Sequence, residues 1–292
     1  MKIVTYNIQY GIGLDGAYDI ARIADAVRGA DVIALQEVTR NSPSNEGRDL
    51  VAELRALLPD YFAAFGAPFG ADMGSRLVDG RAVDTRFEFG NMILSKTPPI
   101  SVRNHLLPRR RSVDKLNLQR GALEAMIATP FGPVRFYSVH LDHMSADERI
   151  AQLAFLMARV NGYAQEGGAL TGVVEMGFPE PPHPDSFVLL GDFNMLPDSA
   201  EYTALAGRPE GDNGVALRTT LPVDAARRLC GAAAEDGALT TWVDPERPDD
   251  ASRHKRIDYG FVSADLVARL QGVRVDRAAA GSDHLPLWLE LG

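Results

Sequence analysis

Polar side chains that could take part in chemistry follow short apolar runs at six places in the sequence. A single residue of this kind is usually a turn former or a cap. Six of them predict a catalytic site, because an enzyme built on a sheet collects its reactive groups where the strands end. They are Asn7 in TYN, Glu37 in LQE, His140 in VHLDH, Asp192 and Asn194 in GDFN, Asp258 in RIDY, and Asp283 with His284 in SDHLP.

The chemistry of these groups favours a hard divalent cation. Carboxylate and carboxamide oxygens are typical ligands of Mg²⁺ and Mn²⁺. The sequence has neither a cluster of cysteines nor a multi-histidine motif of the kind that binds zinc. Such a cation neutralises the oxygens of a phosphate ester while a nearby side chain positions the attacking water. These residues therefore suit the metal-dependent hydrolysis of a phosphoester.

The ordered blocks resemble those of the endonuclease/exonuclease/phosphatase superfamily, the deoxyribonuclease I-like metal-dependent phosphoesterases. The resemblance extends from Asn7 to His284, which is nearly the whole chain. It implies a four-layer αββα fold of the α/β (α+β) class, with two packed, mainly antiparallel β-sheets flanked by helices. Because Asn7 and His284 would share one site, the first and last strands must lie close together, and residues 1–292 are expected to form a single domain.

The same resemblance implies a metal-binding role for three residues. Glu37 is the principal expected ligand, Asn7 would help to place the metal or the phosphate, and Asp283 would complete the metal shell. Family members often carry an acid two residues after the first asparagine, where this chain has Gln9. A neutral carboxamide there weakens the case for a further ligand and favours a core with one metal.

Four further residues are expected to act in the chemical step. Asp192 would orient and deprotonate the attacking water. Asn194, on the same side of an extended chain, would donate to the phosphate or bind a second ion. Asp258 would fix the ring of His284 and favour its protonated form, which binds a phosphate oxygen.

His140 has two interpretations. It shares strand parity with Val134 and Phe136, which is typical of a core histidine. The matching histidine of deoxyribonuclease- and sphingomyelinase-like members serves in phosphate binding or acid catalysis, whereas the abasic-site endonucleases use a tyrosine. The resemblance therefore places His140 among the catalytic residues. Asn91 and Arg120 also match recurring family positions and are expected to contact the substrate.

Mostly short strands must position these residues. Helical periodicity indicates helices over 19–27, 49–58 and 146–165. The strands outnumber the helices and do not alternate with them, which favours packed sheets covered by helices over a TIM barrel or a Rossmann sheet. The apolar and β-branched runs that predict strands cover residues 2–8, 31–36, 90–95, 121–128, 133–141, 186–191, 256–262 and 284–290.

Three segments rich in glycine, proline or charge are predicted to be long loops, over 66–85, 166–185 and 244–255. Loops of this length inside a compact domain are more often functional or mobile than inert. If the last two border the site, their acidic residues would repel a long polyanion. These residues are Glu175, Glu180, Asp185, Asp244, Glu246, Asp249 and Asp250.

Composition excludes several classes of protein. The 292 residues are 46% hydrophobic and 24% charged, which is typical of a globular chain with a large core, and the net charge of -9 does not favour a nucleic-acid partner. Cys230, the one cysteine, cannot form an internal disulfide. No apolar run reaches the ~20 residues of a membrane helix, and the first residues lack a secretory signal, so a cytoplasmic location is expected. The oligomeric state stays open.

Three functions compete. The preferred one is a Mg²⁺- or Mn²⁺-dependent hydrolase of a phosphodiester in a small molecule or lipid head group. The second is an endonuclease or exonuclease, which would use the six basic residues that residues 103–120 carry against one acid. The third is a catalytically inactive binding module, which is disfavoured because every core chemical position holds a competent residue.

Overall fold

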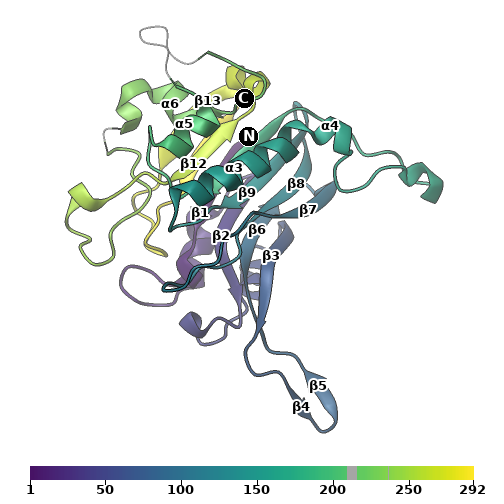
Figure 1. Ribbon diagram of the computed structural model, residues 1–292, viewed down its shortest axis with the longest axis vertical. Helices are drawn as coiled ribbons and strands as arrows, with labels where there is room; N and C mark the ends of the chain where they lie inside the picture. The colour runs from purple at the N-terminus through teal and green to yellow at the C-terminus, as the bar shows by residue number, and fades with distance from the viewer. Residues whose placement is uncertain (209–215, 236) are drawn as a thin grey trace.

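The computed structural model describes residues 1–208, 216–235 and 237–292 (Figure 1). Its two main sheets have six strands each. The first sheet has the strand order β13 (Leu270–Val275), β14 (Leu287–Leu291), β1 (Lys2–Asn7), β2 (Val32–Arg40), β6 (Arg86–Ser95) and β3 (Phe62–Asp72). The second has the order β11 (Val223–Asp224), β12 (Asp258–Val262), β10 (Phe187–Asp192), β9 (Gly132–His140), β8 (Gly121–Thr129) and β7 (Ser101–Leu106).

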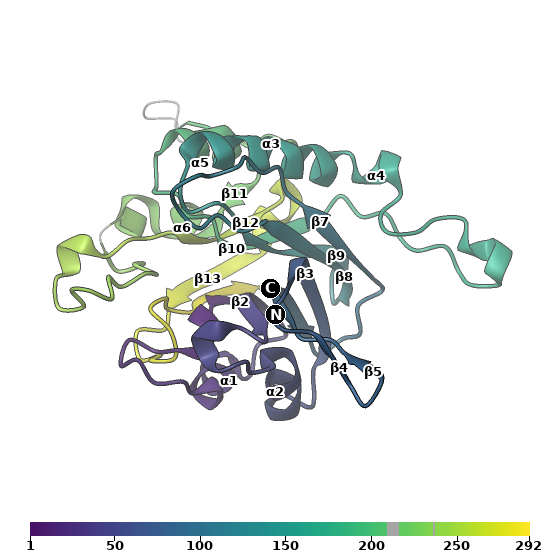
Figure 2. The ribbon, with the colours of Figure 1, turned by 60° about the horizontal axis from the view of Figure 1, so that its bottom comes forward.

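Both sheets are mainly antiparallel. In the described part of the chain, the parallel neighbours are β1 with β2 in the first sheet and β9 with β10 in the second. Helices cover the outer faces, so that four layers are seen edge-on in Figure 2. The helices α1 (Ile20–Val27) and α2 (Leu50–Leu57) lie on the first sheet, and α3 (Ala146–Asn161) and α5 (Ala200–Ala206) lie on the second. This arrangement confirms the predicted αββα sandwich.

Alternation along the strands explains the layers. In β2, Val32 and Ala34 belong to the core between the two sheets, whereas Ile33 and Leu35 pack with α1 and α2. Successive side chains of a strand point to opposite faces, so a strand covered on both faces reads as a continuous apolar run. The fully buried strands that end at the polar residues follow this rule.

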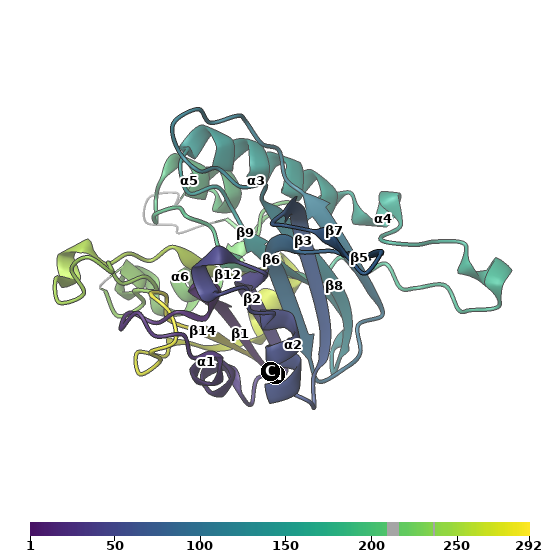
Figure 3. The same ribbon diagram turned by 90° about the horizontal axis from the view of Figure 1, so that it is seen from below.

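The two ends of the chain meet in the first sheet. β1 and β14 pair antiparallel, with Thr5 opposite Leu287, and the Met1 ammonium donates to the Leu291 carbonyl at 2.6 Å. The markers of the two termini accordingly lie side by side in Figures 1 and 2, and in Figure 3 the view looks onto them so that they overlap. This pairing brings the residue that ends β1 close to the segment that precedes β14, as the resemblance required.

Residues 66–85 are not a loop, and the sequence prediction was wrong there. They continue β3 and then form a hairpin of β4 (Arg76–Val78) and β5 (Arg81–Val83), which projects from the body in Figure 1. Every residue of β4 and β5 is exposed, so neither face imposes the apolar alternation by which a strand is recognised.

The long helix expected over 146–165 is divided at Gly162 into α3 and the single turn α4 (Tyr163–Glu166). The prediction also missed the strands β3, β7, β11 and β13 and the helices α5 and α6 (Ala225–Cys230). Segment 166–185 has one 3₁₀ turn, Val173–Met176, and extends away from the layers in all three views. Among the described residues, no helix is long and apolar enough to cross a membrane.

Candidate active site

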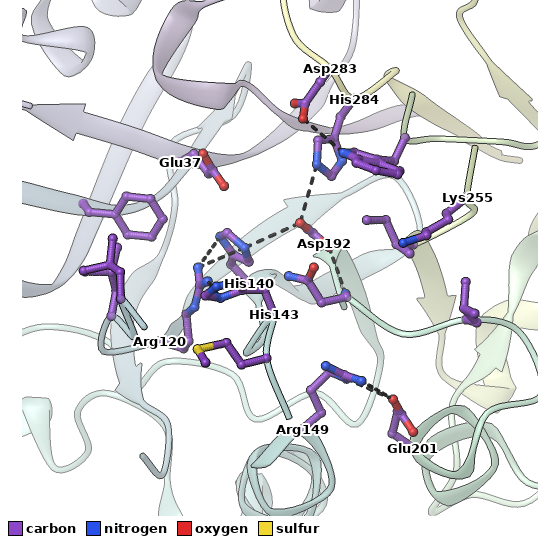
Figure 4. A pocket seen from close by; sticks show the side chains of 18 of the residues that line it. Glu37, Arg120, His140, His143, Arg149, Asp192, Glu201, Lys255, Asp283 and His284 are labelled. Carbon is purple, nitrogen blue, oxygen red and sulfur yellow. Dashed lines mark hydrogen bonds and ion pairs between the residues drawn. The ribbon is translucent and has the colours of Figure 1, made fainter. Parts of the chain in front are cut away.

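A cavity of about 560 Å³ opens at the end of the sandwich where β1, β9 and β10 terminate (Figure 4). Three of the ten predicted site residues, Asn7, Asn91 and Asp258, are buried and do not line it. The other seven form part of its wall: Glu37, Arg120, His140, Asp192, Asn194, Asp283 and His284.

Strand register aligns the centre of the site. Asp192, the last residue of β10, lies opposite His140 of β9 on one side and opposite Asp258 of β12 on the other. The preceding Gly191 allows this close pairing because its φ is 145° and an added Cβ would lie 1.9 Å from the Val139 carbonyl oxygen. Only glycine adopts this backbone conformation without strain.

The sequence had suggested that Glu37 follows the end of its strand. In the structure Glu37 instead lies at a bulge within the strand. β2 continues to Arg40, but its pairing with β6 shifts between Leu35 and Val38, and Glu37 has a φ of 59°. A bulge re-aims a side chain. The Glu37 carboxylate accepts a hydrogen bond from Asn7 Nδ2 at 3.3 Å, and burial raises its pKa against the opposing charge of Arg120.

Two carboxylates flank the imidazole of His284. Nδ1 lies 2.8 Å from Asp258 Oδ2, and Nε2 lies 3.8 Å from Asp192 Oδ2. Burial lowers the pKa of His284, but the charge and hydrogen bond of Asp258 outweigh it and raise the pKa to about 10. Burial and the charge of Asp258 raise the pKa of Asp192. His284 is therefore protonated at neutral pH and carries a positive charge.

Hydrogen bonds orient Asp192 toward the cavity. Its Oδ2 accepts from Asn7 Nδ2 at 3.0 Å, and its Oδ1 accepts from the backbone N–H of Asn194 at 2.8 Å. Asn194 has a φ of 50°, and its side chain donates to the Leu141 carbonyl. Backbone conformations of this rare kind concentrate at functional sites.

On the other side of Asp192 lie Arg120 and two histidines. Arg120 Nη1 is 3.0 Å from His140 Nε2, Arg120 Nη2 is 2.9 Å from His143 Nδ1, and His140 Nε2 is 3.5 Å from Asp192 Oδ2. Burial and the nearby Arg120 charge hold the pKa of His140 well below its usual range, so its ring is neutral. The guanidinium also lies 5.6 Å from the ring centre of Phe89.

Asn91 lies behind the cavity wall. Its side-chain amide donates to the carbonyls of Gly121 and Ser138, at 2.8 and 2.9 Å, and thereby links β6 of the first sheet to β8 and β9 of the second. At this position it supports the end of the sandwich from inside, and the wall is formed by other residues.

Several residues of the wall were not identified from the sequence. His143 closes the VHLDH motif and could have been found there. No local pattern marks the others, among which are Tyr10, Arg149, Trp242 and Lys255. Segment 166–185 contributes no residue to the wall, and segment 244–255 contributes Lys255. The acidic residues of segment 166–185 therefore do not border the site, although this had been expected. Segment 244–255 borders it with a basic residue.

The donor atoms suit a hard divalent cation. Asp192, Asp258 and His284 offer ligand atoms that lie within 4.8 Å of one another. His284 Nδ1, however, is held by Asp258 Oδ2 at 2.8 Å, and Asp258 is buried behind the cavity wall. Glu37 and Asp283 supply carboxylate oxygens to the same cavity, and Oδ1 of Asn7 is a further hard oxygen behind it. The residues present therefore fit magnesium or manganese.

Comparisons with known proteins agree with this geometry. No curated protein matches the sequence significantly. One solved structure that matches, an endonuclease/exonuclease/phosphatase from Beutenbergia cavernae, is 21% identical, with a TM-score of 0.66 over 100% of this chain and 72% of that one. A mannosyl-6-phosphatase from Bacteroides thetaiotaomicron is 18% identical, with a TM-score of 0.62 over 100% and 99% of the two chains.

A 3′ phosphatase from Neisseria, solved with a product DNA hairpin, is 20% identical, with a TM-score of 0.59 over 100% of this chain and 99% of that one. At these identities the likenesses concern the fold. The model of the Endonuclease/Exonuclease/phosphatase family matches residues 4–284, nearly the whole chain and the same span as the blocks that meet in the cavity. The protein is therefore a member of the endonuclease/exonuclease/phosphatase family, a family of phosphoester hydrolases.

Proposed function

We propose that this hydrolase cleaves a phosphodiester in a small molecule or a lipid head group, and that it requires a divalent metal. The main observation in support is that the predicted carboxylates and imidazoles, from distant parts of the chain, line one cavity. The cavity extends to both sides of Asp192, toward Arg120 on one side and Lys255 on the other (Figure 4). A phosphodiester carries an organic group on each side of its phosphorus and would use both.

Glu37 and Asp283 would hold the metal, and Asn7 would help to place it. A bound Mg²⁺ or Mn²⁺ neutralises charge on the phosphate and on the leaving oxygen. Glu37 is partly buried, and the charge of Asp283 adds to the burial that raises its pKa. The negative charges of two carboxylates that face the same cavity favour the binding of a cation between them.

The remaining groups would act directly on water and substrate. Asp192, oriented by Asn7 and Asn194, would accept the proton of the attacking water. Protonated His284, held by Asp258, would donate to a phosphate oxygen as negative charge develops in the transition state. Arg120 would bind a second phosphate oxygen, and neutral His140 lies beside both Arg120 and Asp192.

A nuclease is the second candidate, and one observation favours it. The segment between β7 and β8 contributes Leu116 and Leu118 to the cavity wall, and its basic side chains lie exposed nearby in sequence. Exposed cations beside a phosphoester site would attract a polynucleotide. The basic residues are Arg109, Arg110, Arg111 and Lys115.

A substrate screen tests the proposal. The purified protein is assayed with Mg²⁺, with Mn²⁺ and with excess EDTA on bis(4-nitrophenyl) phosphate, 4-nitrophenyl phosphate, sphingomyelin-like lipids and plasmid DNA. Cation-dependent hydrolysis of a small or lipid diester, faster than that of the monoester and of DNA, is expected. Full activity in EDTA would refute the metal requirement, and absence of hydrolysis with every substrate would favour an inactive binding module.

A further inference from the structure

Trp242 connects two parts of the cavity wall that the proposed chemistry treats separately. The side chain is partly buried and lines the cavity. Its indole Nε1 donates a hydrogen bond to Asp283 Oδ2 at 3.0 Å, and the ammonium of Lys255 lies 4.8 Å from the centre of its ring. One ring therefore contacts both an expected metal ligand and a basic group of the wall.

The backbone around Trp242 is held on both sides. Trp242 exchanges two hydrogen bonds with Lys255, at 2.9 and 3.0 Å. On the other side, Val243 N–H donates to the Asp283 carbonyl at 2.8 Å, and Leu285 N–H donates to the Thr241 carbonyl at 2.7 Å. These bonds fix the backbone of Trp242 relative to the segment that carries Asp283, and this places the indole N–H within hydrogen-bond distance of the carboxylate.

An indole N–H suits a carboxylate that must bind a cation. It is a neutral donor with one hydrogen, so it restrains one carboxylate oxygen without neutralising the charge. Arginine or lysine at the same place would compete electrostatically with the metal. Within the part of the chain that the structure describes, the other oxygen of Asp283 accepts a single long hydrogen bond, of 3.3 Å, from the Ser282 hydroxyl. Most of its lone-pair capacity is therefore left for a ligand in the cavity.

We propose that Trp242 is a positioning residue for the divalent cation and acts by holding the Asp283 carboxylate in its binding orientation. This inference rests on the proposed function, in which Asp283 is a metal ligand. Partners that orient a metal ligand typically contribute about 10- to 100-fold to metal affinity. The indole N–H is therefore expected to have an effect on cation binding that exceeds its effect on folding.

The test is Mn²⁺ binding by isothermal titration calorimetry to the full chain, without substrate. Trp242→Phe keeps an aromatic ring and removes the N–H, and it is expected to raise the Kd for Mn²⁺ about 10-fold or more. Trp288→Phe is the matched control, because Trp288 is the chain's other tryptophan. It is buried among the residues packed with α1 and α2, and its indole N–H has no hydrogen-bond partner among the described residues. The Kd of the Trp288→Phe variant for Mn²⁺ should stay within about 2-fold of wild type.

Urea unfolding of the metal-free proteins separates positioning from a structural role. If the Trp242→Phe variant is less stable but binds Mn²⁺ as tightly as wild type, the positioning role of Trp242 is overturned. The proposed phosphodiesterase function is then left intact. Wild-type protein that binds no Mn²⁺ would overturn both.

A second measurement does not require Trp242→Phe to fold. In Trp288→Phe, Trp242 is the single tryptophan, and paramagnetic Mn²⁺ bound beside Asp283 should quench its fluorescence in a saturable manner. Saturable binding by calorimetry without quenching would place the cation away from Trp242 and contradict the inference.

Discussion

Two aspartates contact the same imidazole and differ in what else they contact. Asp258 lies 2.8 Å from Nδ1 of His284 and is buried behind the wall, whereas Asp192 lies 3.8 Å from Nε2 and lines the cavity. The shorter contact fixes the ring, and the longer one leaves space for a reacting group. Identical side chains thus suit different tasks in the proposed reaction, one of orientation and one of proton transfer.

Removal of the Asp192 carboxylate, or of the imidazole of His284 or His140, should affect turnover more than folding. Asp192→Asn, His284→Ala and His140→Ala are each expected to lower kcat about 100-fold or more, because each removes a group that transfers a proton or binds the phosphate. Steady-state kinetics together with circular dichroism measure this. His183→Ala, at an exposed position outside the wall, is the control. Variants that are unfolded, or folded with wild-type turnover, would contradict the assignment.

The charge of Glu37 has a separate prediction. Glu37→Gln keeps the shape of the side chain and is expected to weaken Mn²⁺ binding by at least about 10-fold, because a neutral amide is a poor ligand. Calorimetry measures the affinity. Glu201→Gln is the control, since Glu201 lines the same cavity but its carboxylate is bound by Arg149 at 2.6 Å. Equal loss of Mn²⁺ affinity in both variants would contradict a specific role for Glu37.

At the scale of elements, the close approach of β9 and β10 depends on Gly191. Gly191→Ala would place a Cβ 1.9 Å from the Val139 carbonyl oxygen and is expected to lower the free energy of unfolding by about 3 kcal/mol. Activity should fall as well, because Asp192 follows directly. Gly70→Ala in β3 is the control, as the nearest atom to its Cβ lies 3.9 Å away. Urea unfolding compares the two, and equal stabilities would show that β10 shifts without cost.

The buried carboxylate of Glu124 in β8 contacts Arg103 and His105 of β7 and gives a pH dependence away from the site. Burial raises the pKa of Glu124, but the His105 hydrogen bond and the Arg103 charge outweigh it and lower the pKa below its ordinary value of 4.5. A carboxyl group with a lowered folded pKa stabilises the protein above the unfolded pKa, and this contribution is lost as the pH falls through the folded pKa.

Glu124→Gln should therefore lower the free energy of unfolding by about 1–3 kcal/mol at pH 7, where the wild-type carboxylate is ionised. The difference between variant and wild type should shrink as the pH is lowered below 4.5. Urea titrations across this range measure it. A difference that stays constant from pH 7 to pH 3 would show that the charge of Glu124 contributes nothing.

Seven residues of the cavity wall could be predicted from the sequence, because the motif around each of them is local. Asp192 is the last residue of a buried strand, and a polar residue at the end of an apolar run can be recognised without the fold. The direction of the Glu37 side chain could not be predicted in this way. It depends on a bulge that arises from the pairing of β2 with β6, where Leu35 lies opposite Met92 and Val38 opposite Gly90. Trp242 likewise reaches the cavity through bridges to Lys255 and His284, which no local pattern encodes.

At the scale of the whole molecule, the structure changes the electrostatic argument about substrate. Segment 166–185 contributes nothing to the cavity wall, so its acids do not border the site. In segment 244–255, Asp244 is paired with Arg253, and the residue that lines the cavity is Lys255. What still opposes a long polyanion is the net charge of -9, against which the exposed basic segment near Arg120 acts locally.

The preference for a small or head-group phosphodiester over duplex DNA is therefore tested on the basic segment itself. A protein that follows a duplex neutralises several phosphates, and each contact steepens the fall of affinity with salt. The wild type is expected to show a higher kcat/KM for the small diester than for plasmid DNA at both low and moderate salt. Replacing Arg109, Arg110 and Arg111 by serine should leave turnover of the small diester unchanged, because none of the three lines the cavity. Plasmid cleavage that is faster than diester cleavage, collapses with added salt and is lost in this variant would establish the nuclease function instead.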